Sequence, residues 1–572
     1  MKTLFLLLLL SIASAAHSAT YYIDYTAADD SASRSTKSTP WKRCPGMVGF
    51  AGAYSHTAGD VFVFKGGVTW PAAALPLTLA YSGTAANVDT YTVDATWYSN
   101  GAWSYPIFDG GKNGSHIIFM DYGGQSYIKI NSLQLLNVND GVSNASGTAI
   151  DLYDGSNIEI SYCWLQPSSV EAFSIEAYRV NCSNINFHHN YIRQALRCTC
   201  YGAGGYVLNN VQFHDNDWQG PGTMYMGTYH ADGLMIGNPF AGGSSVAVTN
   251  LQFYNNRFYG NWQTATALLY SNGWTSGTLV YNNVFSFENT TPVQNIFSPG
   301  FVDFGNNDAS IQVYNNTFAN NNMHGFGGGY GLGAASAIAV LSPVSGTTVV
   351  IKNNIFSLTQ IDINVDAHAT LTADYNLHYP DTSASYGELV YFGSNQYKTL
   401  AAAQAAGYET HSPAVGDPRF INVGNGTTGS ANWQLQASSR AIGAAGQLTL
   451  FTADLFGTTR GAAWDIGAYQ YTVSLPGAPV ITSALTAPGT IGSSFSFAIT
   501  ATNSPTSFSA SPLPAGLSVN TSTGVISGTP TVTGTTSVAI GATNANGAGA
   551  ATLALTVSVI PPSSARTAIT TQ

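Results

Sequence analysis

The middle of this chain repeats one short pattern, and this repeat constrains the fold more than any other feature of the sequence. The segment 184–192 (NINFHHNYI) returns as 210–218 (NVQFHDNDW) and 250–258 (NLQFYNNRF), and shortened copies follow. Each copy alternates apolar and polar residues, bends, and resumes with an aromatic or branched residue. Equivalent positions are 133, 163, 190, 216, 256, 283, 316, 354 and 376, so the steps vary from 22 to 40 residues. This variation indicates loops of different length inserted into a constant unit.

The alternation predicts a strand with one buried face in every copy. A single copy cannot bury that face alone, so the copies must stack into a solenoid. Asparagine tolerates a bend and hydrogen-bonds through its amide, so stacking predicts a ladder of buried side chains. The ladder residues are Asn190, Asn216, Asn256, Asn283, Asn316 and Asn354. The residues three positions earlier are predicted to fill the core: Phe187, Phe213, Phe253, Val280, Val313 and Ile351.

The repeated units resemble those of right-handed parallel β-helix proteins of the pectate-lyase-like superfamily, over about residues 20–471. Segments near both ends of that region add to the resemblance: 21–24 and 39–42 at the start, and 416–420 and 464–469 at the close. The resemblance implies a right-handed parallel β-helix solenoid. It implies nothing about chemistry by itself, because one fold supports many functions.

The segments that flank the β-helix have different compositions. Residues 1–19, with the apolar run 4–10 and small residues after it, are predicted to be a secretory signal peptide. A linker at 472–480 precedes residues 481–559, which resemble the immunoglobulin-like domains appended to bacterial surface and secreted enzymes. Residues 560–572 are expected to form a disordered tail. The predicted fold class is therefore all-β: a parallel β-helix followed by a small immunoglobulin-like β-sandwich.

The charge composition excludes one large class of partners. The chain has 18 Lys and Arg against 29 Asp and Glu, and only 8% of its residues are charged. Binding of nucleic acid needs a cluster of cations that this composition does not supply. No stretch after the signal peptide is long and apolar enough to span a membrane. Together with the predicted signal peptide, this leads us to expect a monomer that is secreted or held at the cell surface. The resemblance to β-helix proteins implies an extracellular polysaccharide as its partner.

The cysteines do not form a disulfide scaffold. Five are present, Cys44, Cys163, Cys182, Cys198 and Cys200, so at least one has no partner within the chain. Cys198 and Cys200 lack metal-ligand spacing and would point the same way on one strand. We expect buried thiols or one local bridge.

Acidic residues recur at a similar distance before the ladder position. Outward-facing residues of stacked strands line up about 4.8 Å apart, so residues distant in sequence can form one row. An acidic row on one face is predicted for Asp151, Glu176, Asp303 and Asp362, which lie 12 to 14 positions before a ladder residue. Asp232 precedes the long insertion at 238–249 and is assigned to the same sheet.

The segment 229–236 (YHADGLMI) is the candidate catalytic segment. Its Asp-Gly resembles the Asn-Thr-Asp-Gly segment of the polygalacturonase family, whose Asp is catalytic. The resemblance implies that Asp232 is a general acid or base, although that family's Gly-His-Gly and Arg-x-Lys motifs have no counterpart here. His230 would share the face of Asp232 and could orient a water or a carboxylate. The alternative is that Asp232 only shapes a turn before Gly233.

Two kinds of glycan cleavage fit these residues. Carboxylates two coils apart, such as Glu176 with Asp232 or Asp232 with Asp303, would be roughly 9.6 Å apart, near the upper end of the range of inverting glycosidases. Polysaccharide lyases on this fold typically pair carboxylate-bound Ca²⁺ with a basic residue, and Ca²⁺ is the one cofactor implied by that route. Candidate bases near this face are Lys129, Arg193 and Arg197.

Aromatic side chains in the coils around the long insertion could stack on sugar rings. The candidates for substrate binding are Trp218, Tyr229 and Trp262, together with Arg197. The alternative is that these rings pack the inserted loops onto the β-helix.

A second polar cluster lies at the bend of two successive repeats. Stacking would bring His188 over His214 and His189 over Asp215, which could form a metal site or an acid–base site. In later copies the same two positions hold Tyr and Asn, so the cluster could equally be an ordinary polar turn. No metal is assigned from the sequence.

The sequence as a whole favours a secreted enzyme that cleaves glycosidic bonds of an extracellular polysaccharide on the outer face of a β-helix, as a hydrolase or a lyase. The alternative is a non-catalytic carbohydrate-binding adhesin or a structural protein of the cell surface. An open groove lined by aromatic residues would favour the enzyme.

Overall fold

The structure is a computed structural model, and it describes residues 18–558 apart from several internal segments. These segments are 33–34, 100–102, 113–115, 139–146, 168–170, 194–196, 203–204, 221–232, 237–246, 261–266, 272–273, 288–299, 305–309, 321–335, 342, 344, 381–386, 424–430 and 473–476. Within the described residues the helices are the 3₁₀-helix η1 (Ala72–Ala74) and the α-helix α1 (Leu400–Ala405), and everything else of regular structure is strand. Neither described helix is long and apolar enough to cross a membrane.

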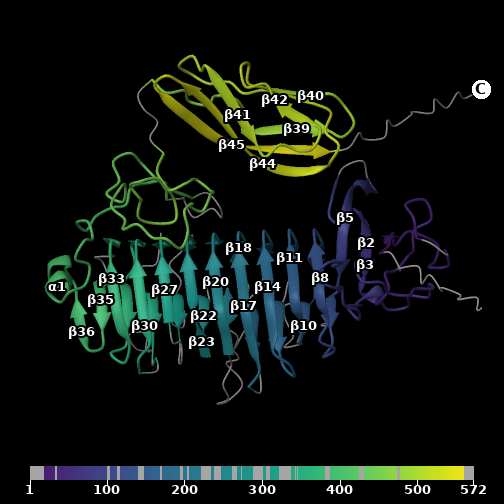
Figure 1. The fold of residues 1–572 in the computed structure, drawn as a ribbon, viewed down its shortest axis with the longest axis horizontal. Helices are drawn as coiled ribbons and strands as arrows, with labels where there is room; N and C mark the ends of the chain where they lie inside the picture. Colours follow the sequence, from purple (N-terminus) through teal and green to yellow (C-terminus); the bar gives the residue numbers. More distant parts are fainter. Residues whose placement is uncertain are drawn as a thin grey trace, which may run out of the picture.

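Three parallel sheets wind around a common core (Figure 1). Sheet A contains β1 (Thr20–Ile23), β2 (Val61–Gly66), β5 (Asp89–Tyr98), β8 (Ser126–Asn131), β11 (Ser156–Ser161), β14 (Cys182–His188), β17 (Val207–His214), β20 (Ala247–Tyr254), β24 (Thr278–Tyr281), β27 (Ser310–Tyr314), β30 (Thr348–Lys352) and β33 (Thr370–Asp374), with β23 (Trp274–Ser276) beside β20. Sheet B contains β4 (Leu77–Thr78), β7 (Ile118–Met120), β10 (Thr148–Tyr153), β13 (Glu171–Ala177), β16 (Arg197–Gly202), β19 (Leu234–Ile236), β22 (Ala267–Ser271), β26 (Gly300–Phe304), β29 (Ser336–Val340), β32 (Ile361–Val365), β35 (Glu388–Phe392) and the antiparallel β36 (Asn395–Tyr397). Sheet C contains β3 (Thr69–Pro71), β6 (Ile107–Asp109), β9 (Gln134–Leu136), β12 (Trp164–Gln166), β15 (Tyr191–Arg193), β18 (Asp217–Gln219), β21 (Arg257–Tyr259), β25 (Val284–Phe287), β28 (Thr317–Asn320), β31 (Ile355–Ser357) and β34 (Leu377–Tyr379).

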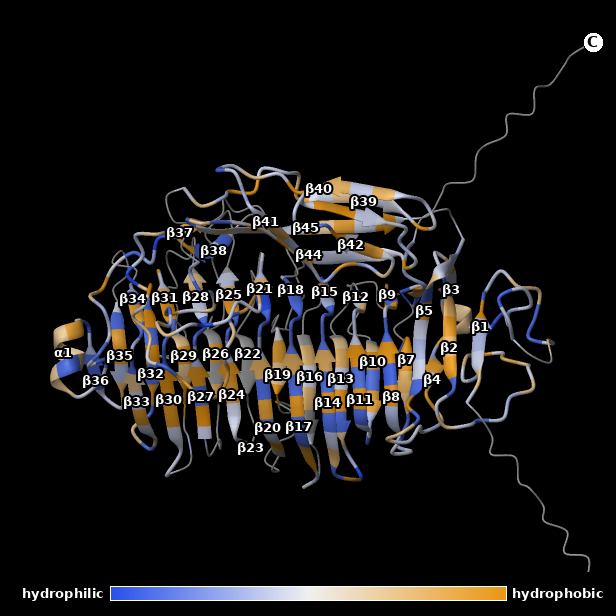
Figure 2. Ribbon diagram, turned by 45° about the horizontal axis from the view of Figure 1, so that its top comes forward, coloured by the Kyte–Doolittle hydropathy of each residue, from blue (hydrophilic) through white to orange (hydrophobic). Residues whose placement is uncertain are grey.

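Each coil takes one strand from every sheet. The chain passes from sheet A through a tight bend to sheet C, then to sheet B, and returns to sheet A one coil further on. Apolar and polar residues alternate along the strands (Figure 2), and the residues predicted for the core are all fully buried. The predicted parallel β-helix is confirmed.

The asparagine ladder runs along the bend between sheets A and C. The backbone N–H of each ladder residue donates to the Oδ1 atom of the next one, as from Asn190 to Asn216 at 2.9 Å and from Asn283 to Asn316 at 2.9 Å. Each Nδ2 group also donates to a backbone carbonyl inside the turn, as from Asn316 to Val280 at 3.0 Å. The ladder ends at Asn376, whose Nδ2 donates to Glu409 Oε1 at 2.9 Å.

The bend itself lies one residue earlier than the sequence suggested. The positive φ angles belong to the residues that precede the ladder, among them His189 (55°), Asp215 (56°) and Asn255 (54°). The ladder residues keep ordinary φ angles, because their side chains must point into the turn to reach the next coil. The prediction that the ladder asparagines adopt the bend conformation was therefore wrong.

The interior beside the ladder is a column of stacked rings. Phe258, Phe285, Phe318 and Phe356 follow one another in sheet C with ring centroids 5.2 to 5.3 Å apart. The column ends on His378, whose ring centroid is 5.4 Å from that of Phe356. The cysteines contribute to the same core, since all five are buried.

His378 is buried between two carboxylates at the end of the ladder. Its Nδ1 atom lies 2.6 Å from Asp362 Oδ2, and its Nε2 atom lies 3.4 Å from Glu409 Oε1. Burial alone would lower the pKa of His378, but Glu409 and Asp362 raise it to about 9. A cationic His378 thus neutralises acidic groups that close the last coils.

The C-terminal part covers the outer face of sheet C and then forms a separate sandwich. The hairpin β37 (Phe420–Asn422) and β38 (Asn432–Leu435) shares a hydrophobic cluster with outward residues of sheet C such as Val284 and Ile355. The sandwich packs β39 (Thr486–Thr490), β45 (Gly547–Ser558), β44 (Gly534–Asn544) and β41 (Ser507–Ser511) against β40 (Phe495–Ala498), β43 (Val525–Gly528) and β42 (Leu517–Val519). It lies alongside the β-helix (Figure 1), and Thr533 Oγ1 donates to the carbonyl of Ala95 in β5.

Candidate functional site

Sheet B holds the described members of the predicted acidic row. Asp151 lies in β10, Glu176 in β13, Asp303 in β26 and Asp362 in β32. Asp362 is fully buried with its Oδ2 atom 2.6 Å from His378 Nδ1, so its predicted place on an exposed acidic row was wrong. The side chains of Asp303 and Arg197 are outside what the structure describes, although their backbones are not. Four other predicted residues lie outside the described residues: Asp232, His230, Tyr229 and Trp262.

The strand register shows which residues of the predicted acidic row lie near Asp151 and which lie far from it. Asp151 pairs with Ser174 in β13, and Ser174 pairs with Thr199 in β16. Asp303 belongs to the same register row but lies five strands from Asp151, which corresponds to about 24 Å. Asp303 is therefore too far from Asp151 to act with it on one glycosidic bond.

Glu176 is a carboxylate that lies close in register to Asp151. It lies two residues beyond Ser174 on the same face of β13. One coil step of about 4.8 Å and two residue rises of about 3.3 Å give a diagonal backbone separation of about 8 Å. Both side chains are mostly buried, with Asp151 2% and Glu176 7% exposed.

Hydroxyl groups and an imidazole surround the two carboxylates. Thr199 Oγ1 donates to Ser174 Oγ at 3.0 Å, and Ser174 Oγ donates to Glu176 Oε1 at 2.7 Å. His116 Nδ1 lies 3.1 Å from Asp151 Oδ2. Burial lowers the pKa of His116, so the imidazole is neutral near pH 7. His116 therefore places a polar but uncharged imidazole ring next to Asp151.

Three aromatic rings, Tyr122, Tyr153 and Tyr178, lie beside Glu176; we call them the tyrosine cluster. The centroid of Tyr122 is 4.5 Å from that of Tyr153 and 5.2 Å from that of Tyr178. Burial and the charge of Glu176 raise the pKa of Tyr122. Tyr178 is 46% exposed, and the Arg179 guanidinium lies 4.0 Å from the Tyr122 centroid. The cluster gives the carboxylates an exposed aromatic border.

Asp154 holds this border in place. The residue has a positive φ of 61° in the turn between β10 and β11. Its Oδ1 atom accepts backbone N–H groups of Tyr178 at 2.6 Å and Arg179 at 2.8 Å. The turn after β13 is thereby fixed to the turn after β10, so Tyr178 and Arg179 have a defined position next to Glu176.

The structure corrects the assignment of Trp218 to substrate binding. Trp218 is 1% exposed, and its ring stacks on Phe258 with centroids 4.9 Å apart. It lies two residues after its ladder asparagine, a position that faces the core in other coils as well. Its ring is not available to a sugar.

The structure also corrects the location of two proposed lyase bases. Lys129 lies in sheet A, where its Nζ atom is 2.7 Å from Glu159 Oε1. Arg193 lies in sheet C, where it donates to the carbonyl of Asp217 at 3.0 Å. Neither residue is on the face of Asp151 and Glu176, because each belongs to a different strand of its coil.

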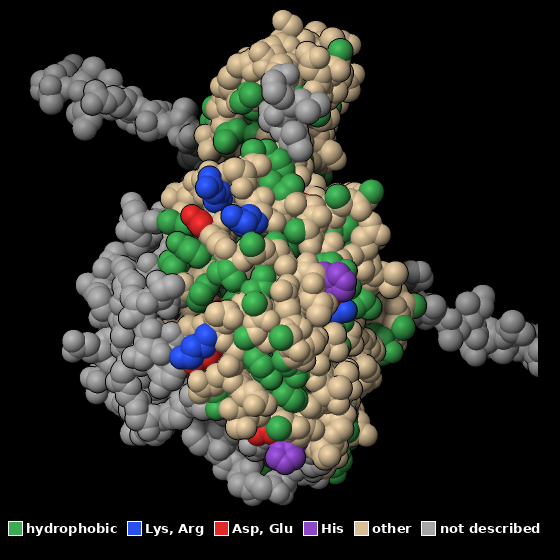
Figure 3. Space-filling view, turned by 90° about the vertical axis from the view of Figure 1, so that its left-hand side faces the viewer, with side chains coloured by type: hydrophobic (Ala, Val, Ile, Leu, Met, Phe, Trp, Pro, Cys, Tyr) green, Lys and Arg blue, Asp and Glu red, His purple; other side chains and the backbone are tan. Residues whose placement is uncertain are grey.

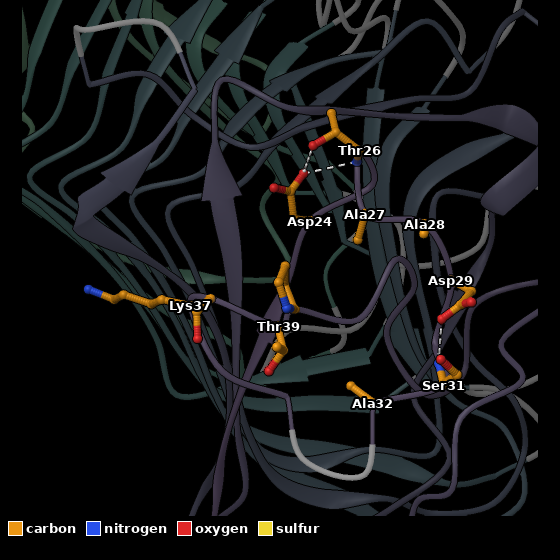
Figure 4. Close-up of a pocket in the computed structure, with 11 residues that line it drawn as sticks. Asp24, Thr26, Ala27, Ala28, Asp29, Ser31, Ala32, Lys37 and Thr39 are labelled. Atoms are coloured by element: carbon orange, nitrogen blue, oxygen red, sulfur yellow. Dashed lines mark hydrogen bonds between the residues drawn. The ribbon is translucent and has the colours of Figure 1, made fainter.

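A hollow of about 480 Å³ at the N-terminal end is less suited to chemistry (Figure 4). Its acidic residues already have partners: Asp24 accepts from Thr26 and pairs with Lys65 at 2.7 Å, and Asp29 accepts from the backbone of Ser31. The opposite end of the solenoid shows only scattered charged side chains in its described part (Figure 3). The face of sheet B remains the best candidate for catalysis.

Sequence reasoning missed His116 and the tyrosine cluster. His116 directly precedes the strand one coil before Asp151, in a coil whose repeat pattern is too degenerate to align by its ladder residue. Tyr122 and Tyr178 lie in turns after sheet B strands, where the repeat imposes no pattern. The sequence offered one indication of the tyrosine cluster, namely that tyrosines recur in the turns after the strands of sheet B.

Comparisons with known proteins identify the C-terminal domain of the chain. Residues 478–559 match the family model described as "Putative Ig domain". A search of curated proteins found no relative of the chain. Among solved structures, pectate lyase Pel9A aligns over 80% of this chain and 98% of its own with 13% identity and a TM-score of 0.33. A rhamnogalacturonan lyase aligns over 73% of this chain and 97% of its own with 12% identity and a TM-score of 0.31.

A shorter match has higher identity. A structure described as a putative alpha-galactosidase from Bacteroides fragilis is 32% identical over 15% of this chain, with a TM-score of 0.14, and the match spans 19% of that protein. The sheet topology, the ladder and the immunoglobulin match together define the class of this chain. It is a parallel β-helix protein with a C-terminal immunoglobulin-like domain.

Proposed function

We propose that this protein hydrolyses glycosidic bonds of an extracellular polysaccharide on the outer face of sheet B. The observation that supports this best is the diagonal placement of Asp151 and Glu176 on adjacent strands. A backbone separation of about 8 Å allows the two carboxyl groups to lie roughly 6.5 to 9.5 Å apart, the range that inverting glycosidases use. One carboxyl group can then protonate the leaving oxygen while the other activates a water on the opposite side of the sugar.

The surroundings suggest which carboxylate takes which role. Glu176 borders the tyrosine cluster, so it is the group nearest to a bound sugar chain, and we assign it as the general acid. Asp151 lies deeper and contacts the neutral His116, so we assign it as the base that takes a proton from the attacking water. The water oxygen bonds to the anomeric carbon as the glycosidic C–O bond breaks, and the proton of Glu176 goes to the departing hydroxyl.

The border of the site favours a neutral or weakly acidic polysaccharide. Tyrosine rings offer flat apolar surfaces on which sugar rings stack. A strongly anionic polymer would need cations, and the chain as a whole has 18 of them against 29 acidic groups. Arg179 is the described cation next to the tyrosine cluster, and its guanidinium is already placed over a ring.

Two further elements of this proposal depend on the sequence alone. Residues 1–19 are assigned as a signal peptide that exports the chain, so that it meets its polysaccharide outside the cell. Asp232 and His230 remain candidates for an additional acid or base on the strength of the Asp-Gly resemblance. Calcium belongs to the lyase alternative and would be required only if cleavage proceeds by elimination.

The test compares single carboxylate variants of the mature chain. Asp151→Asn and Glu176→Gln should each lower the release of reducing ends from a cleaved polysaccharide by at least a hundredfold, because general acid–base catalysis contributes about 10²–10⁴ in rate. Asp109→Asn, a partly buried carboxylate of sheet C, serves as the matched control and should keep full activity.

Activity unchanged in both site variants would refute the assignment of the carboxylate pair. Full activity in those variants combined with loss in Asp232→Asn would move the chemistry to the segment 229–236. Sugar binding without any cleavage by the wild-type protein, over a broad panel with and without Ca²⁺, would instead support the carbohydrate-binding adhesin.

A further inference from the structure

Three histidines meet on the outer face of sheet A, away from the proposed catalytic face. His188 ends β14 and pairs in register with His214, which ends β17. Their rings are stacked, with centroids 4.9 Å apart and planes within 1°. His189 follows His188 at the bend, with a φ of 55°. Two adjacent coils thus present three imidazoles to one point on the surface.

The ring nitrogens are close enough to share one ion. His188 Nδ1 and His189 Nδ1 are 2.9 Å apart. One ring nitrogen from each of the three residues lies within 4.8 Å of the others. A tetrahedral zinc with bonds of about 2.0–2.1 Å would hold its nitrogen ligands about 3.3–3.4 Å apart. His188 and His189 are already near this separation, and a ring nitrogen of His214 lies within 4.8 Å of both.

The opposite ring nitrogens are held by oxygen atoms of neighbouring side chains. His188 Nε2 lies 3.2 Å from Glu159 Oε1, and His214 Nε2 lies 2.9 Å from Asn186 Oδ1. Metal-binding histidines typically donate their second N–H group to such an acceptor, which fixes the ring and leaves the other nitrogen for the ion.

A fourth ligand is available from Asp215. Its Oδ2 atom lies 2.7 Å from His214 Nδ1, and its side chain is 29% exposed. Three imidazoles with one carboxylate or water form a donor set that suits zinc and other late first-row transition metals. Calcium and magnesium prefer sites made of oxygen ligands.

Later coils show what the same positions look like without this chemistry. There the pair is Tyr254 with Asn255 and then Tyr281 with Asn282, and the two tyrosine rings stack at 4.8 Å. The ring of His214 continues this column, since it stacks on Tyr254 at 4.7 Å. An ordinary polar turn therefore needs only an aromatic ring and an asparagine. Formation of the turn alone does not require three histidines at these positions.

We propose that His188, His189 and His214 bind one divalent transition-metal ion, with Zn²⁺ as the chemically best match. The ion links the coil of β14 to the coil of β17 from outside. It therefore acts as a clamp on the solenoid, independent of the carboxylates on sheet B.

The later coils supply substitutions that the fold already accepts at these positions. His189→Asn and His214→Tyr reproduce the residues of the next coils and remove one ligand each. His411→Gln is the matched control: His411 also contacts a carboxylate, Asp374, at 2.6 Å and stacks on a tyrosine, but it is not part of the three-histidine cluster.

The experiment is a calorimetric titration of the metal-depleted mature protein with Zn²⁺, repeated with Ca²⁺. We expect one Zn²⁺ per chain, at least a tenfold weaker affinity in His189→Asn and in His214→Tyr, and no change in His411→Gln. Added Zn²⁺ should also raise the thermal unfolding midpoint of the wild type and of His411→Gln, but not of the two ligand variants. The proposal is overturned if the wild type binds no Zn²⁺, or if the ligand variants bind it as tightly as the wild type.

Discussion

Removal of one ladder asparagine should destabilise the β-helix far more than removal of an asparagine elsewhere. Asn316 makes four side-chain hydrogen bonds. Its Oδ1 atom accepts the backbone N–H and the Nδ2 group of Asn283, both at 2.9 Å. Its Nδ2 group donates to the carbonyl of Val280 and to Asn354 Oδ1, both at 3.0 Å. Asn316→Ala removes all four bonds inside a fully buried turn.

The expected loss follows from these contacts. A typical intramolecular hydrogen bond contributes about 1 kcal/mol net, so four bonds amount to about 4 kcal/mol. The backbone N–H of Asn283 would also remain buried without an acceptor. An unsatisfied buried donor costs about 1–3 kcal/mol more. We therefore expect the free energy of unfolding to fall by about 5–7 kcal/mol.

Urea unfolding of the mature protein, followed by tryptophan fluorescence and far-ultraviolet circular dichroism, measures this loss. Asn209→Ala is the control, because Asn209 is only partly buried and accepts two bonds, from Thr249 at 2.7 Å and Asn250 at 2.8 Å. Its removal should cost less than about 1 kcal/mol. Equal shifts of the two variants would refute the view that the buried ladder holds the coils together.

Three further predictions address other parts of the molecule. Because the pKa of His378 is raised to about 9, the folded state binds this proton more tightly than the unfolded state. The resulting stabilisation, up to about 3 kcal/mol, should be complete below about pH 6.5 and lost as pH rises toward 9; a flat stability profile from pH 6 to 9 would contradict it. Trp218→Ala should cost about 3–5 kcal/mol of stability and leave sugar affinity per folded molecule unchanged, whereas weaker sugar binding by the folded variant would return Trp218 to the site. Asp232→Asn should abolish cleavage without unfolding the protein if the Asp-Gly resemblance identifies a catalytic residue, and retained activity in a reducing-end assay would remove Asp232 from the mechanism.

The solenoid could be predicted because its stabilising contacts repeat. Every coil needs an amide side chain at the ladder position, as at Asn256, and an apolar side chain at the core position, as at Phe253. The same residue types therefore recur along the sequence. The bend could not be placed exactly, because the adjacent residues Asn255 and Asn256 both suit it. Only the side-chain hydrogen bonds distinguish them.

The site could be predicted only in part, because it depends on where inserted loops place residues that do not repeat. Asp151 and Glu176 could be assigned to one sheet because they lie at nearly constant distances before the ladder. Lys129 and Arg193 were assigned to the wrong face, because a distance in sequence does not say which of three sheets a residue joins. Trp218 could have been placed in the core, since its offset from Asn216 equals that of core rings in later coils.

The most direct test of the central claim is digestion of a polysaccharide panel by the wild-type protein in H₂¹⁸O, followed by mass spectrometry of the products and absorbance of unsaturated uronates. Hydrolysis by Asp151 and Glu176 predicts one ¹⁸O atom at each new reducing end and no unsaturated product. Unsaturated ends without ¹⁸O would show elimination, and they would contradict the assignment of this carboxylate pair as a hydrolytic acid and base.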